Sequence, residues 1–374
     1  MLTEKNDRQT ILRQSNIELL RIVAMVIIVA HHFAVHSGFA FSPKTITINR
    51  LWIQFIQIGG KIGVDIFVLI SGYFLISQQS VKTKKVVALW GKVFFYSIAL
   101  YLVFVVSGLT PFGIKELIMQ LAPIAFSQWW FASTYFVLYL LVPYINKLLR
   151  MFDKEQYVRF LALLLLLWSV IPSFTGQALE SNSLLWFVVL YAIAGYIKLF
   201  DIRTKLTGAK LIGLSIFCIV LTFLSAVAFD IIGTKIPIFG AHATFFYSMQ
   251  KLPVLVISVL MFVGFTKIDI GYSKFVNMIS SATFGVYLIH DNRYVRPFIW
   301  KTVFQNASYA ESNLLIPHSL IAIAVVFVGC SIIELARIYL IEKKITSAIN
   351  KISILIDSKI NSLLSGRALN MLKQ

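Results

Sequence analysis

The sequence predicts an all-α, polytopic membrane protein with about ten transmembrane helices. Of its 374 residues, 58% are hydrophobic and only 13% are charged. The mean hydropathy is +0.82, and the apolar share is far above that of a soluble domain. Apolar runs of about twenty residues recur along the whole chain, which indicates many membrane spans rather than a single anchor.

These apolar runs define the expected spans in chain order. They cover residues 17–36, 52–78, 86–109, 129–148, 159–175, 184–200, 211–229, 247–266, 275–290 and 314–341. The second and last are long enough to tilt or to extend past the bilayer, and the ninth is short and polar. The first follows basic residues, as a secretory signal would, but it carries Arg21 and two histidines and lacks a small-residue cleavage site. We therefore expect it to be a retained span.

The basic residues follow the alternation of the spans. The net charge of +18 could suggest a nucleic-acid partner, but the placement of the charges argues against one. With the N-terminus inside, 24 of the 34 lysines and arginines lie in cytoplasmic segments, beginning with Lys5, Arg8 and Arg13. This pattern follows the positive-inside rule and predicts that both termini are cytoplasmic. No nucleic acid is expected as a partner.

Two parts are expected along the chain, a transmembrane domain over residues 1–342 and a basic amphipathic cytoplasmic tail over 343–374. The tail has an isoleucine-rich stripe opposed by lysines, which is typical of a helix lying on an anionic leaflet. A partner-binding helix is the alternative. Ile114, Leu117, Ile118 and Leu121 recur at helical spacing in an outer loop and predict a short interfacial or re-entrant helix there.

Ionisable residues inside the first span are the main functional signal, because such residues are costly in a membrane. Arg21 and His32 are eleven residues apart, which is about three turns plus roughly 20° and a rise of roughly 16 Å. They therefore share one helix face, whereas His31 points about 80° away. This geometry suits a long anionic ligand whose reactive end reaches an imidazole. We expect His32 to carry the chemistry and His31 to make a supporting hydrogen bond.

Two further residues are candidates for the same site. Lys61 and Asp65 lie i,i+4 in the glycine-rich second span and can form a structural ion pair. The functional alternative places Asp65 beside His32, where it would fix the tautomer of the imidazole. His290 ends the ninth span at the outer interface and could line a site that faces outward.

The remaining signals are weaker. Lys82, Lys84 and Lys85 lie on the cytoplasmic side, from which a phosphate-bearing cofactor would enter. Trp129, Trp130 and Phe131 begin the fourth span, where we expect an aromatic belt or a platform that stacks on a sugar. The two cysteines, Cys218 and Cys330, lie far apart in apolar runs, so neither a disulfide nor a metal site is expected.

Taken together, these residues resemble the acyltransferase-3 family of integral membrane acyltransferases, of the type that O-acetylates bacterial surface polysaccharides. The resemblance runs from SNIELLRIVAMVIIVAHHF through GVDIFVLISGYFL and QWWFASTYFVLYLLVPYINKLL to SATFGVYLIH. Arg21 and His32 match the Arg-x10-His pattern of the family. The basic Arg-x-x-Arg pair of the family stands here as Lys82 and Lys85, and lysine keeps the charge but loses bidentate phosphate geometry.

The resemblance implies transfer of an acyl group, usually acetyl, from cytosolic acyl-CoA to a hydroxyl of an extracytoplasmic or lipid-linked glycan at a bacterial plasma membrane. Arg21, Lys82 and Lys85 would bind the CoA. His32 would be the general base, with Asp65, His31 and His290 around it, by direct transfer or through an acyl-histidine. No metal and no permanently bound cofactor are expected. The alternatives are a proton-coupled transporter or flippase of a polysaccharide precursor, and a membrane sensor or scaffold.

Overall fold

The fold is entirely helical over the part of the chain that a computed structural model describes, residues 14–42, 44–200 and 204–371. Nine helical segments in this part are long and apolar enough to cross a membrane. They are Ser15–His36, Ile48–Leu75, Thr83–Val106, Trp130–Met151, Lys154–Thr175, Ser183–Phe200, Gly208–Gly233, Pro237–Lys267 and Leu315–Glu342. The all-α polytopic fold is thus confirmed. Lys5, Arg8 and Arg13, on which the expected orientation partly depends, lie outside the described residues.

The expected ninth span, residues 275–290, is a helix of 17 residues, α13 (Lys274–His290). It is shorter than the other nine segments, and most of its second half is buried. A helix of this length rises only about 25 Å, which is less than the hydrocarbon thickness of a typical bilayer. Its place inside the bundle explains why the sequence of this run is polar.

Three helices at the centre of the bundle position the site. α1 (Ser15–His36) packs on α3 (Gly59–Leu75) and α13, and α3 also packs on α9 (Ser183–Phe200) and α12 (Leu252–Lys267). The faces in contact are fully buried. The remaining helices are α2 (Ile48–Gln57), α4 (Thr83–Val106), α5 (Ile114–Leu121), α6 (Trp130–Met151), α7 (Lys154–Leu165), α8 (Ile171–Thr175), α10 (Gly208–Gly233), α11 (Pro237–Ala241), α14 (Val295–Pro297), α15 (Leu315–Arg337) and α16 (Lys343–Met371).

Glycines allow α1 and α3 to come into backbone contact. A Cβ added at Gly60 would lie 2.1 Å from Cγ of His31, and one at Gly63 would lie 2.6 Å from the carbonyl oxygen of Ala24. Without such small residues, side chains would hold two membrane helices apart. The glycine-rich run therefore places the end of α1 that bears the histidines directly against the start of α3.

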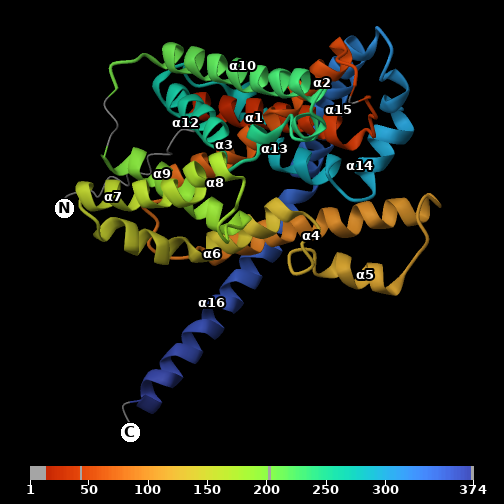
Figure 1. The fold of residues 1–374 in the computed structure, drawn as a ribbon. Coiled ribbons are helices and arrows are strands. Elements are labelled where there is room, and N and C mark those ends of the chain that lie inside the picture. Colours follow the sequence, from red (N-terminus) through yellow and green to blue (C-terminus); the bar gives the residue numbers. More distant parts are fainter. Residues whose placement is uncertain (1–13, 43, 201–203, 372–374) are drawn as a thin grey trace.

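The two segments predicted outside the spans are both helices. α5 covers residues 114–121 as expected, and its buried Gln120 accepts a hydrogen bond from Ser97 of α4 at 2.6 Å. α16 extends away from the bundle as one long helix (Figure 1). Near its middle Asp357 accepts a hydrogen bond from Thr83, the first residue of α4. Its attachment to a membrane surface remains a prediction.

Substitution Gly60→Ala is expected to destabilise the protein by about 1–3 kcal/mol, because overpacking forces the two helices apart. At an unconstrained helical position the same change would instead stabilise by up to about 1 kcal/mol. Gly91→Ala in α4 is the matched control, since no atom lies within 4 Å of a Cβ there. Thermal melting of the detergent-purified variants checks this. Equal melting temperatures for the two variants would show that the contact between α1 and α3 is not tight.

Candidate active site

His32 lies at the centre of a chain of hydrogen bonds between α1 and α13. Its Nδ1 is 2.8 Å from Nε2 of His290, and Nδ1 of His290 is 2.6 Å from the carbonyl oxygen of Val286. A carbonyl oxygen can only accept, so Nδ1 of His290 carries a proton. In the neutral imidazole its Nε2 then accepts, and Nδ1 of His32 donates. The lone pair of His32 is left on Nε2.

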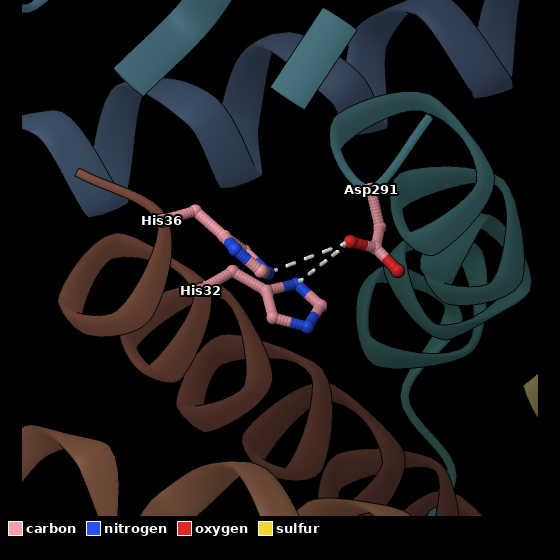
Figure 2. Close-up of side chains that lie close together, drawn as sticks. All are labelled: His32, His36 and Asp291. Carbon is pink, nitrogen blue, oxygen red and sulfur yellow. Dashed lines mark ion pairs between the residues drawn. The ribbon is translucent and has the colours of Figure 1, made fainter. Parts of the chain in front are cut away.

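An acidic residue lies beside this pair. Asp291 follows His290 directly, and its side chain points toward His32 and His36 (Figure 2). Its Oδ1 is 3.8 Å from Nδ1 of His32 and 4.0 Å from Nε2 of His36. Arg296 donates a hydrogen bond to the same oxygen at 3.1 Å. Burial raises the pKa of Asp291 to about 6, against the opposing effect of the Arg296 charge. A carboxylate at this position stabilises an imidazolium at His32.

The same three residues have the donor types of a metal site. One nitrogen each from His32 and His36 and one oxygen from Asp291 lie within 4.8 Å of one another. Zinc at bond lengths of about 2.0–2.1 Å would bring neighbouring ligand atoms to about 3.4 Å, so the group would have to contract. The carboxylate already pairs with Arg296. The contacts present are those of a hydrogen-bonded histidine with electrostatic support.

His31 is held separately from His32. Its Nδ1 donates to the carbonyl oxygen of Gln57 at 2.6 Å, which is the kind of supporting hydrogen bond expected from the sequence. The two side chains leave the helix in different directions, but His31 still belongs to the same site as His32, because both imidazoles line one cavity. The imidazole of His31 packs directly against Gly60 at the start of α3. His32 differs from His31 in having a carboxylate within 4 Å.

The expected place of Asp65 beside His32 is wrong. Asp65 is fully buried and accepts a hydrogen bond from the indole of Trp186 at 3.1 Å. It does not form the alternative ion pair with Lys61 either, because Nζ of Lys61 lies over the ring of Trp130, 5.1 Å from its centre. Residues four apart on a helix, such as Lys61 and Asp65, lie on the same face and can form an ion pair, but this spacing does not require one. Asp291 and His290 occupy the positions next to His32.

Aromatic side chains form much of the cavity wall. Trp130 and Phe131 line it together with Phe67, Phe284 and Tyr287. Trp129, only 2% exposed, is buried in the core. The expectation of an aromatic belt is therefore wrong for Trp129, and sugar stacking on Trp130 and Phe131 stays a prediction. Trp130 and Phe131 form the start of α6, and their side chains line the same cavity as His31 and His32.

Two further cavities lie beside this one, toward the other end of α1. The second shares Phe67, Phe131 and Phe284 with the first, and the third shares Arg21, Ser71, Leu89 and Tyr135 with the second. Arg21 lies between the last two, 3.7 Å from Glu18, and its Nε is buried without a hydrogen-bond partner. The three cavities thus adjoin one another and form a path along α1 that these shared side chains divide into sections.

Of the two lysines predicted to bind the cofactor, one lines these cavities. Lys85 lines the third cavity, whereas Lys82 lies outside the lining residues of all three. Lys92 of α4 also lines the second cavity and pairs with Glu334 at 2.9 Å. Three cations therefore gather at the end of the path that is remote from the histidines.

The comparisons with known proteins agree with this arrangement. A family model described as an acyltransferase domain, Acyl_transf_3, matches residues 14–335. The chain belongs to the acyltransferase-3 family. It is thus a multi-pass membrane acyltransferase, and the family model favours this over the transporter and the scaffold. Neither a curated protein nor a solved structure matches the chain at a significant level.

The site residues that the sequence did not reveal are Asp291, His36 and Lys92. Asp291 is adjacent to a predicted residue, and His36 lies four residues after His32, one helical turn away. Both signals were present in the sequence. What could not be read there is that the end of α13 meets the end of α1.

Substitution His290→Phe is expected to lower the turnover of acyl transfer at least about 10²-fold, because loss of an orienting partner leaves the base in the wrong tautomer. Turnover in liposomes and ¹⁵N NMR of labelled histidine, which reports the protonated ring nitrogen of His32, check this. The exposed His242, which directly follows α11, offers the control His242→Phe. An unchanged His32 tautomer in the His290 variant would contradict the orienting role.

Proposed function

We propose that this acyltransferase transfers an acetyl group from cytosolic acetyl-CoA to a hydroxyl of an extracytoplasmic or lipid-linked glycan, in a bacterial plasma membrane. The observation that carries the proposal is the path of three cavities along α1. Cations line its one end, and His31 and His32 line the other. A long ligand with phosphates at one end and a thioester at the other matches that distribution.

The cationic end supplies the groups that bind phosphate. Arg21 has an unpartnered buried Nε, and a guanidinium binds phosphate oxygens through paired N–H donors. Lys85 and Lys92 add two charges to the same walls. Ser280, Ser281 and Thr283 also line the second cavity, where Ser280 donates a hydrogen bond to Glu18. Between the cationic end and the histidines, aromatic side chains line the cavities, and the extended arm of the acetyl-CoA donor would lie against them.

At the other end His32 is the general base. Its Nε2 removes the proton of the acceptor hydroxyl as that oxygen attacks the thioester carbonyl carbon. The carbon–sulfur bond then breaks, and the thiolate of CoA takes the proton back from the imidazolium. His290 keeps Nδ1 of His32 as a donor throughout. The carboxylate of Asp291 stabilises the positive charge between the two proton transfers.

Substitution His32→Ala is expected to reduce O-acetylation about 10²–10⁴-fold, the usual contribution of a general base. Transfer of labelled acetyl groups by purified protein, and mass analysis of surface glycan from cells that carry the variant, both measure it. His242→Ala is the control. A His32 variant that stays in the membrane and acetylates normally would contradict the role of the base.

Binding of the CoA phosphates can be tested with two neighbouring lysines. Lys85→Ala is expected to raise the KM for acetyl-CoA about 5- to 10-fold with little change in kcat, since it removes uniform binding. Lys84→Ala is the matched control, because Lys84 is exposed and lies outside the cavity walls. Steady-state kinetics at two salt concentrations would measure the difference, which should shrink as salt increases. Equal KM values for the two variants would contradict entry of CoA at this end.

A further inference from the structure

Lys61 places a cation on the wall of the cavity that contains the histidines. It belongs to the first turn of α3, next to Gly60, which contacts His31. Its Nζ lies over the face of the Trp130 ring at 5.1 Å from the centre. In the described part of the chain no carboxylate lies within 4 Å of this nitrogen.

Among the described residues this separates Lys61 from Arg21 and Lys92, whereas Lys85, at the far end of the cavities, also has no carboxylate within 4 Å. Arg21 lies 3.7 Å from Glu18, and Lys92 lies 2.9 Å from Glu334. Arg296, just outside the cavity, pairs with Asp291 at 3.1 Å. Lys61 has instead the π-face of a tryptophan, which stabilises an ammonium without neutralising it. Asp65 and Asp291 act on this ammonium only from beyond 4 Å, so no direct ion pair keeps it from a negatively charged atom of a substrate.

Acyl transfer creates such an atom at this place. When the hydroxyl oxygen bonds to the thioester carbon, the π pair of the carbonyl moves to its oxygen, which becomes an oxyanion. In a largely apolar cavity a preorganised positive charge stabilises a developing negative charge far more than it would in water. His32 supplies the base, but the histidines provide no group for the oxyanion.

We propose that Lys61 is the oxyanion-stabilising catalytic residue of this enzyme, with Trp130 as the residue that positions its ammonium. The inference rests on the proposed function and assigns the one step that the histidines leave open. The oxyanion forms next to the ammonium as the proton of the acceptor moves to Nε2 of His32. When the tetrahedral intermediate collapses, the electron pair returns to the carbonyl, the carbon–sulfur bond breaks, and His32 returns the proton to the thiolate.

Kinetics of three variants test the proposal. Lys61→Met keeps the length of the side chain and removes its charge, and kcat should fall about 10²–10³-fold with KM for acetyl-CoA nearly unchanged. Lys61→Arg keeps the charge and should retain at least about a tenth of the activity. Lys84→Met is the matched surface control. If Lys61→Arg lost as much activity as Lys61→Met, or if neither changed kcat, the proposal would be overturned.

A spectroscopic measurement separates this inference from the proposed function. Infrared spectra of acetyl-CoA labelled with ¹³C at the carbonyl are recorded with the inactive His32→Ala protein, with and without Lys61→Met. The carbonyl stretch should move to lower frequency when Lys61 is present and should lose that shift in the double variant. Binding without a Lys61-dependent shift overturns the oxyanion role alone. Absence of acetyl-CoA binding to the otherwise unaltered protein overturns the proposed function and this inference together.

Discussion

The backbone contact between α1 and α3 is the constraint on which the rest of the site depends. Gly59, Gly60 and Gly63 remove the side chains that would separate the helices, and His31 fills the space over Gly60. The contact fixes the histidine-bearing end of α1 against the start of α3, where Lys61 begins the cavity wall. α13 then covers the other side of α1 and brings His290 to His32. A looser pair of helices would leave these groups without a common cavity.

Several buried charges within the bundle are paired, as an apolar surrounding favours. Glu334, fully buried, accepts from Lys92 at 2.9 Å, from Tyr96 at 2.5 Å and from Arg337 at 2.7 Å, and Arg50 pairs with the buried Asp230. These groups join α15 to α4 and α2 to α10. Structural pairing thus accounts for most of the ionisable residues in the spans. Arg21, whose Nε has no hydrogen-bond partner although the guanidinium lies 3.7 Å from Glu18, and Lys61 both line the cavities.

The sequence was sufficient for the fold class and for most of the helices, because long apolar runs and helical periodicity are local signals. Arg21 and His32 could be linked because they share one helix, and the resemblance to the family supplied the chemistry. The contacts made by Asp65 and Trp129 could not be predicted. Each depends on which distant helix lies opposite, Trp186 of α9 in the first case. His290 and Asp291 joined His32 only through packing of α13 on α1.

The hydrogen bonds around His32 also limit what the reaction can be. Direct transfer and a transient acyl-histidine were both open from the sequence. Val286 accepts from His290, and His290 accepts from Nδ1 of His32, so only Nε2 of His32 is available to take a proton or to bond with an acyl carbon. The two routes therefore need the same nitrogen, at the same wall of the same cavity. The two routes differ in whether the acceptor hydroxyl must be present when the thioester is cleaved. The same hydrogen bonds among His32, His290 and Val286 serve both routes.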